Sequence, residues 1–282
     1  MDPLARILST EADVYVARGD YARAVSNGVD GVRWGTDLAR DGDILALENG
    51  LLIEGSGFNN IKRSSIDRLD VRSAQALALR LEILDACRFS YTRTLQNEKI
   101  TGLKRLEMIF KFQDWRKNLP TTQSSAQIIT TYERLMNETI IDVALPYPRR
   151  RGVSVDGADA LSKVIFGTLA RQDATHLSTM GSGSFYENLR AISRLDATML
   201  ALRAFKAEHG KYPMTLSELT PTILRRVPVD PFSDKPLRYK LKAIEYSLYS
   251  VGYDGVDDGG KALPKRAKPN AKGDIVAGVN TP

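Results

Sequence analysis

The sequence predicts an α+β protein in which an N-terminal all-helical region precedes a long helix and a small antiparallel sheet. Through about the first 145 residues, apolar side chains recur every three or four positions, which is typical of amphipathic helices. After Leu237 the apolar positions alternate with a period of two, which is typical of strands. We therefore expect two domains, with residues 1–186 forming the helical domain and residues 187–282 forming the α+β head.

The helical domain opens with two helices joined by a tight turn. An apolar stripe through Leu8 and Ala12 closes at Gly19, a natural helix stop, and Asp20 then caps a second helix. The joining sequence ARGDYARAV resembles the turn of a tetratricopeptide-like helical hairpin. Because a period of about 34 residues does not recur, a helical bundle and a TPR-like solenoid are both consistent with the pattern.

Apolar stripes at helical spacing predict five further helices before the head, near residues 44–53, 77–84, 103–110, 128–140 and 161–169. The first of these is expected to loosen at Gly55 and Gly57, because glycine weakens a helix interior. The fourth is expected to stop at Pro146. A run of small residues from Ser178 to Ser184 is expected to separate the last of them from the head.

A candidate linker lies between the last two of these helices, where the sequence LPYPRRRGVSVDG combines prolines, glycines and three successive arginines. This composition is typical of a connector or a functional loop. Arg149, Arg150 and Arg151 are the candidate binding residues for an anionic ligand. A solvated connector without a ligand is the alternative interpretation.

The head is expected to begin with a helix that ends at Gly210. Its apolar stripe consists of Ile192, Leu195, Met199, Leu202 and Phe205. Thr215 and Glu218 have the spacing of a capping box for the short helix that follows. Alternating apolar positions around Tyr239, and again around Leu248, then predict a β-hairpin.

Four motifs of the head occur in the order LRAFKAEHGKYP, VPVDPFSDKPLRY, YSLYSVGYDGVDDGG and GDIV. In this order they resemble the globular head of the major pseudopilin of type II secretion systems, over roughly the last 90 residues. The whole chain also resembles uncharacterised bacterial envelope proteins in which a helical region precedes such a head. The pseudopilin resemblance implies a long helix, a small sheet and a calcium-binding loop.

The acidic loop has the chemistry that calcium requires, which is about six to eight hard oxygen ligands. Asp254, Asp257 and Asp258 place three carboxylates within five residues, and the glycines around them let the backbone curl. The resemblance adds Asp274, at the family position near the chain end, and two backbone carbonyls complete the set. The predicted Ca2+ ligands are Asp254, Asp257, Asp258, Asp274, Leu248 and Val251. An ordinary Asp-Gly turn without a metal is the alternative.

Composition narrows the classes of function. A hydrophobic share of 43% and a charged share of 26% fit a folded chain with a substantial core. Cys87 is the single cysteine, which excludes an intramolecular disulfide, and its apolar helical surroundings predict a buried thiol. No stretch approaches the roughly 18 to 20 apolar residues that span a bilayer, and no signal peptide follows Met1.

On these grounds we expect a non-enzymatic envelope protein related to secretion, whose calcium-stabilised head is attached to a helical interaction domain. Protein partners are expected to bind the helical domain. The resemblance favours the periplasm or the cell envelope, with an anchor preceding Met1 as the expected membrane contact. Without such an anchor the expected compartment is the cytoplasm.

Two other classes of function are the alternatives. One is an enzyme with its site in the helical domain, although no nucleophile elbow, phosphate loop or HExxH motif occurs. The other is a binder of an anionic polymer through the basic surface, since the net charge is +6 and the pI is near 9.3. The densest basic tract, residues 261–272, has no aromatic side chain to stack on a base, so nucleic acid is not expected as a partner.

Overall fold

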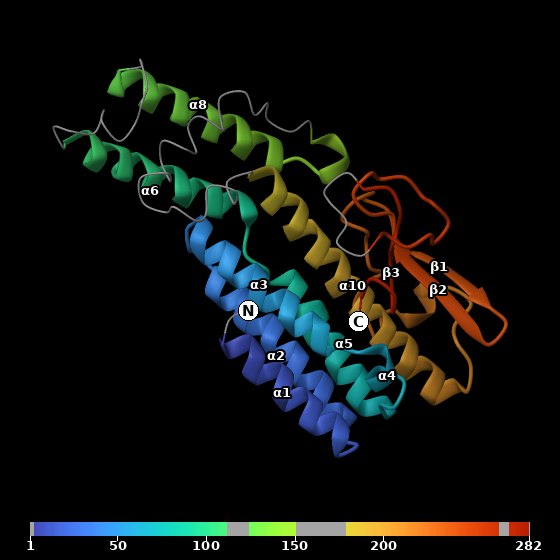
Figure 1. Cartoon of the computed structure of the whole chain (residues 1–282). Helices are drawn as coiled ribbons and strands as arrows, with labels where there is room; N and C mark the ends of the chain where they lie inside the picture. Colours follow the sequence, from blue (N-terminus) through green and yellow to red (C-terminus); the bar gives the residue numbers. More distant parts are fainter. Residues whose placement is uncertain (1–2, 112–123, 151–178, 265–270, 282) are drawn as a thin grey trace.

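A computed structural model describes residues 3–111, 124–150, 179–264 and 271–281, and it has the predicted α+β architecture (Figure 1). The helical region contains α1 (Pro3–Ala17), α2 (Tyr21–Ala39), α3 (Ile44–Asn60), α4 (Arg63–Ile66), α5 (Val71–Ala86), α6 (Tyr91–Lys111), α8 (Ser125–Val143) and the 3-10 helix η1 (Tyr147–Arg149). The remainder contains α10 (Thr179–His209), the 3-10 helix η2 (Leu216–Leu219), β1 (Arg238–Lys242), β2 (Glu245–Ser250) and β3 (Ile275–Val276).

The first two helices form the predicted hairpin. Gly19 has a φ of +73°, which reverses the chain after α1 at a conformation that glycine adopts without strain. The carboxylate of Asp20 then accepts a hydrogen bond from the backbone N–H of Arg23 at 3.1 Å, which satisfies an end donor of α2. The sequence signals for this turn are therefore confirmed.

α2 and α3 pack so closely that their backbones touch through glycines. A Cβ atom on Gly57 would lie 2.5 Å from the backbone N of Val32, and one on Gly50 would lie 2.5 Å from the carbonyl O of Gly35. α3 continues through Gly57 to Asn60, so the predicted loosening is wrong. Burial of these glycines against α2 outweighs their low helix propensity.

α10 is the central helix of the fold. It packs against α5 and α3 on one side and against β2 and η2 on the other (Figure 1). The predicted stripe is buried, and so are Ala197, Ala201 and Ala204, because neighbours cover every side of this helix. α10 begins at Thr179, so the break predicted over the small-residue run is wrong. The proposed domain boundary at residues 186/187 falls within α10, and it stays a prediction.

The C-terminal part forms the predicted hairpin and adds a third strand. β1 pairs with β2 antiparallel, with Tyr239 opposite Leu248, and β3 pairs with the end of β2, with Ile275 opposite Ser250. The capping box is present at η2, where Thr215 and Glu218 exchange hydrogen bonds as predicted.

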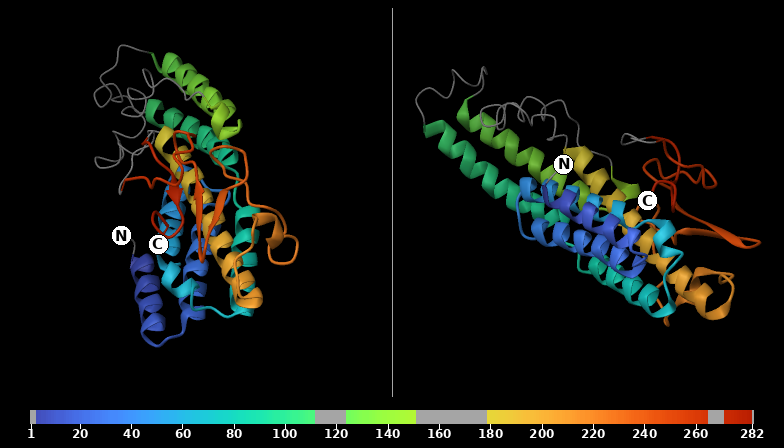
Figure 2. Two further views of the ribbon diagram at one scale, coloured as in Figure 1. Left: turned by 90° about the vertical axis from the view of Figure 1, so that its right-hand side faces the viewer. Right: turned by 60° about the horizontal axis from the view of Figure 1, so that its bottom comes forward.

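α6 and α8 lie side by side and extend beyond the rest of the helices (Figures 1 and 2). The phenol of Tyr132 on α8 donates a 3.0 Å hydrogen bond to the carbonyl of Glu98 on α6. The helix predicted near residues 161–169 lies outside the described residues. Within them, no helix has the length and apolar character needed to cross a membrane.

Cys87 is exposed, so the predicted burial of its thiol is wrong. α5 ends at Ala86, and Cys87 lies just beyond its last helical residue, where the chain turns away. The apolar helical run that predicted burial ends at Ala86, so Cys87 is not part of it.

Asp196 lies in the middle of α10 and is fully buried. Within the described chain neither carboxylate oxygen has a partner at hydrogen-bonding distance. Burial raises the pKa of Asp196 well above its usual range, and the side chain of Thr281 acts in the opposite direction. Burial therefore favours the neutral form of this carboxyl group in the folded chain.

Replacing Gly57 with alanine is expected to lower the free energy of unfolding by about 1 to 3 kcal/mol, because the new methyl group meets the backbone of α2. Gly55→Ala is the matched control, since its methyl group meets only the end of Leu189, at 4.0 Å. Alanine there is favoured by about 1 kcal/mol of helix propensity. Thermal unfolding followed by circular dichroism separates the two variants. Equal melting temperatures would contradict the close packing of α2 on α3.

Asp196→Asn is expected to change how stability depends on pH. Well below pH 4 the carboxyl is protonated in both the folded and the unfolded chain, so the wild type should there be at its most stable relative to the variant. As pH rises through the folded-state pKa, the wild type loses stability, because the unfolded chain releases this proton more readily. At pH 7 the variant should therefore melt at the higher temperature. A difference in melting temperature that is independent of pH would show that Asp196 does not titrate in this way.

Candidate functional site

Asp274 closes the acidic loop and is fully buried beside β3. Its carboxylate accepts hydrogen bonds from the backbone N–H groups of Gly260, at 2.7 Å, and of Asp258, at 3.4 Å. Burial raises the pKa of Asp274, the two N–H donors lower it, and repulsion from Asp257 and Asp258 raises it further. The structure thus brings these three carboxylates to one loop.

The other two predicted aspartates of the loop, Asp254 and Asp257, are engaged within the protein. Asp257 accepts hydrogen bonds from the guanidinium of Arg238 and from the phenol of Tyr249, both at 2.9 Å. The Arg238 contact is the main cause that holds the pKa of Asp257 below its usual value. Asp254 accepts a 3.1 Å bond from Val256 and so caps its own loop.

Asp257 and Asp258 are both exposed, but within the described chain the carboxylate of Asp258 makes no hydrogen bond or ion pair. It is therefore the side chain most able to turn toward a cation without breaking a contact. The carbonyl of Leu248 accepts a 3.0 Å bond from Ala277, which occupies it in the sheet. The backbone N–H of Val251 donates to Asp230 at 3.0 Å.

The predicted ligands do not converge into a finished metal site. Among the residues that the structure describes, no group of three acidic, histidine or cysteine side chains is arranged to hold a metal ion. The loop is closed instead by the hydrogen bonds of Asp274 and by the ion pair of Asp257 with Arg238. Calcium binding by this loop stays a prediction, and it requires Asp257 to exchange Arg238 for the metal.

Asp230 fastens the segment before β1 to the end of β2, a role that sequence reasoning missed. Its buried carboxylate accepts four hydrogen bonds, two on each oxygen. The donors are the backbone N–H groups of Phe232 and Val251, both at 3.0 Å, and the hydroxyls of Ser233, at 3.0 Å, and Ser250, at 2.7 Å. The sequence signalled only a turn at Asp230-Pro231, because two of the four donors lie about twenty residues away.

A buried ionic network connects the helical region to α10. Glu54 on α3 is fully buried and accepts hydrogen bonds from Arg88, at 2.6 Å, and from the hydroxyl of Thr36, at 2.5 Å. Desolvation lowers the pKa of Arg88, but the charges of Glu54 and Asp85 outweigh it, so the pKa is raised. Arg88 therefore stays charged although its side chain is only 3% exposed.

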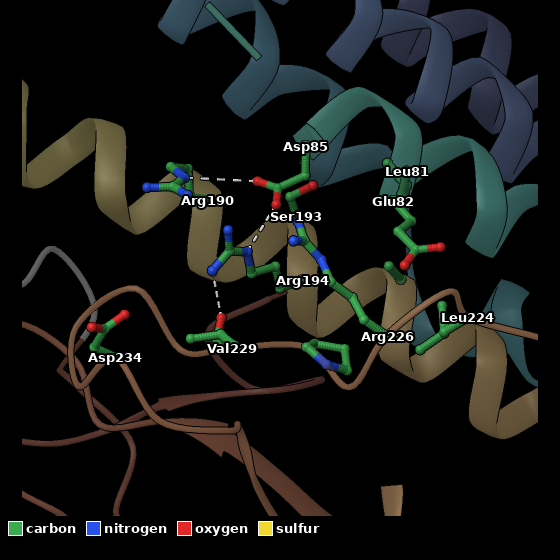
Figure 3. A pocket seen from close by; sticks show the side chains of 12 residues that line it. Leu81, Glu82, Asp85, Arg190, Ser193, Arg194, Leu224, Arg226, Val229 and Asp234 are labelled. Carbon is green, nitrogen blue, oxygen red and sulfur yellow. Dashed lines mark hydrogen bonds and ion pairs between the residues drawn. The ribbon is translucent and has the colours of Figure 1, made fainter. Parts of the chain in front are cut away.

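The network continues along α10 through Glu187, Arg190 and Arg194. One oxygen of Glu187 accepts from Arg150, at 2.7 Å, and the other from Arg190, at 2.9 Å. Asp85 at the end of α5 accepts from Arg194, at 2.8 Å (Figure 3). Arg194 also donates to the carbonyl of Val229, at 2.6 Å, so it ties the helices to the segment that leads into the head.

Two adjacent cavities flank the contact between Arg194 and Val229. The smaller, of about 190 Å3, lies between α5, α10 and residues 224–234, and Figure 3 shows its lining. The larger, of about 340 Å3, is lined by residues 143–147 and Arg150, by the start of α6, by the first half of α10, and by Val229, Pro231 and Asp234. Arg190, Arg194 and Asp234 line both cavities.

The structure describes two of the three arginines predicted to bind an anion, Arg149 and Arg150, and of these two only Arg150 lines a cavity. It lines the larger one, with a side chain that is 16% exposed. Arg149 is exposed on η1, and Arg151 lies outside the described residues. Sequence reasoning missed Arg190 and Arg194, because arginines four apart on a helix read as an ordinary solvated face.

Asp230→Asn is expected to destabilise the chain by about 3 kcal/mol, since each carboxylate oxygen accepts one backbone N–H. Whichever way the amide turns, its NH2 group faces a buried N–H donor. Asp234→Asn is the control, because Asp234 is exposed and asparagine tolerates its positive φ of 58°. Chemical denaturation should show the loss for the first variant alone. Matching midpoints for both variants would overturn the role given to Asp230.

No family model, no curated protein and no solved structure matches the chain. The resemblance of the head to a pseudopilin therefore stays a prediction from its motifs.

Proposed function

We propose that the chain is a non-enzymatic protein of the bacterial cell envelope, related to secretion, that carries a pseudopilin-like head on a helical interaction domain. The order of elements supports the proposal. A long helix, α10, leads through a short 3-10 helix and the Asp230 segment to the β1–β2 hairpin, the acidic loop and β3. This order accords with the four motifs on which the resemblance rests.

The observation that carries the proposed role is the enclosure of α10. In a fibre-forming pseudopilin, a hydrophobic assembly helix leads straight into the head. Here α5 and α3 cover the side of α10 that the sheet leaves open, and the ionic network fixes it there. No residue of α10 from Leu189 to Phe205 is exposed. This part of the helix has no free face for packing into a fibre, so a solitary scaffold or binding protein is the better role.

Exposed apolar side chains on α2 and α3 support a protein partner for the helical region. Trp34 and Leu38, one turn apart on α2, are 48% and 46% exposed, and Leu45 and Leu52 on α3 are 49% and 61% exposed. Single exposed apolar residues are normal on a protein surface. Several of them on two packed helices favour a contact surface for another protein.

The repulsion among Asp257, Asp258 and Asp274 supports the proposed calcium site, because a bound cation would relieve it. Calorimetric titration of chelator-treated protein with CaCl2 is expected to give saturable heat. At a calcium concentration about one hundred times Kd, binding should stabilise the fold by about 2.7 kcal/mol and raise the melting temperature.

Asp258→Asn is the variant that tests the site, because among the described residues the Asp258 carboxylate has no hydrogen-bond or ion-pair partner to lose. It should melt like the wild type in chelator and lose most of the calcium-induced shift. Asp234→Asn should keep the full shift. No heat with the wild type, or an undiminished shift in Asp258→Asn, would leave the loop as a turn without a metal.

The proposed compartment is tested by protease accessibility in the native cells. An antibody against the chain should detect digestion in spheroplasts treated with an added protease, while a cytoplasmic marker stays intact. Protection of the chain until the cells are lysed would contradict the envelope assignment and favour the cytoplasm.

A further inference from the structure

The larger cavity beside η1 has the size of a small-ligand site. Its volume of about 340 Å3 lies at the lower end of the range of roughly 300 to 1,000 Å3 that such sites occupy. Three guanidiniums line it, from Arg150, Arg190 and Arg194, and their side chains are 16%, 28% and 14% exposed. These charges are therefore largely removed from water.

Each of the three guanidiniums has N–H donors to spare. A guanidinium carries five such donors. In the described chain Arg190 makes one hydrogen bond, to Glu187, whereas Arg150 and Arg194 make two each. Each oxygen of Glu187 accepts one of these hydrogen bonds, from Arg150 and from Arg190, so the two arginines share a single negative charge.

The buried network also has more cations than anions. Its four guanidiniums are those of Arg88, Arg150, Arg190 and Arg194. Its three carboxylates are those of Glu54, Asp85 and Glu187. Asp234 lines the cavity as well, but it is exposed at the rim, where water screens its charge. An unbalanced charge of this kind is costly when partly buried, and a bound anion would compensate it.

The uncharged side chains that line the cavity indicate which kind of anion would fit it. Val143, Leu145, Pro146 and Pro231 contribute apolar surface, and Tyr147 and Tyr186 contribute aromatic rings. Ser90 and Thr92 add polar surface beside them, so the lining is mixed, and an anion with an apolar body could place that body against the apolar part. The surplus of one charge matches a carboxylate, whereas a phosphate monoester carries about −1.5 to −2 at neutral pH.

We propose that this cavity binds a small organic monocarboxylate, with Arg150, Arg190 and Arg194 holding the carboxylate and the apolar walls holding the body. Guanidinium forks match the planar carboxylate and donate charge-assisted hydrogen bonds to it. The inference rests on the cavity and its charges, and it is independent of the proposed calcium loop and of the proposed compartment.

Isothermal titration with 3-phenylpropanoate tests the site on the full chain at low ionic strength. The expected result is saturable binding of one molecule per chain, with no binding of the neutral 3-phenylpropanamide. Acetate should bind more weakly because it lacks the apolar body, and inorganic phosphate should compete poorly. Failure of 3-phenylpropanoate to bind, equal binding of the amide, or tighter binding of phosphate would overturn the proposal.

Arg150→Met and Arg149→Met are the matched variants, because the two arginines are neighbours on the chain and only Arg150 lines the cavity. Arg150→Met should weaken binding of 3-phenylpropanoate about tenfold or more, and Arg149→Met should leave it unchanged. Arg150→Lys keeps the charge but loses the fork, so it should weaken binding by less. Circular dichroism melts show that each variant is folded. Equal affinities for Arg150→Met and Arg149→Met, both folded, would assign the binding elsewhere.

Discussion

The ion pairs around Asp85 fix the position of α10, and the rest of the structure depends on that position. Asp85 lies in the last turn of α5, where Arg88, Arg190 and Arg194 surround it, and its side chain is only 7% exposed. Removing the Asp85 carboxylate would leave the charge of these arginines uncompensated, which costs far more than the intact pairs contribute. The network therefore specifies one arrangement of α5 against α10, and both cavities and the segment before β1 follow from it.

Local signals in the sequence were enough to predict most of the elements, because caps and turns act over a few residues. Asp20 caps α2 and the Thr215–Glu218 pair caps η2, as their positions in the sequence predicted. The segment with a period of two forms the β1–β2 hairpin. Contacts between distant segments were not predictable in this way. α3 passes through Gly57 because α2 lies against it, and α10 is buried on all sides because two layers meet on it.

The candidate sites show the same difference between local signals and contacts of distant segments. The acidic loop and its closure by Asp274 were predictable, since the loop is short and the resemblance placed its last member. The four-fold role of Asp230 was not, because its donors come from two separate segments. Arg190 and Arg194 become candidate site residues only because folding brings α10 against Asp85 and the end of η1. Their spacing in the sequence is the same as that of arginines on a solvated helix face.

Because α10 follows α3 and α5 in the sequence, these helices are synthesised before the helix that packs against them. The apolar residues of α5, among them Leu77 and Leu81, leave the ribosome well before the helix that covers them. Until α10 follows, the nascent helical region displays the surface that α10 will occupy. Exposed apolar surface of this kind favours aggregation and chaperone binding. A chain cut short before residue 179 would therefore be a poor substitute for the helical domain, however regular its own helices are.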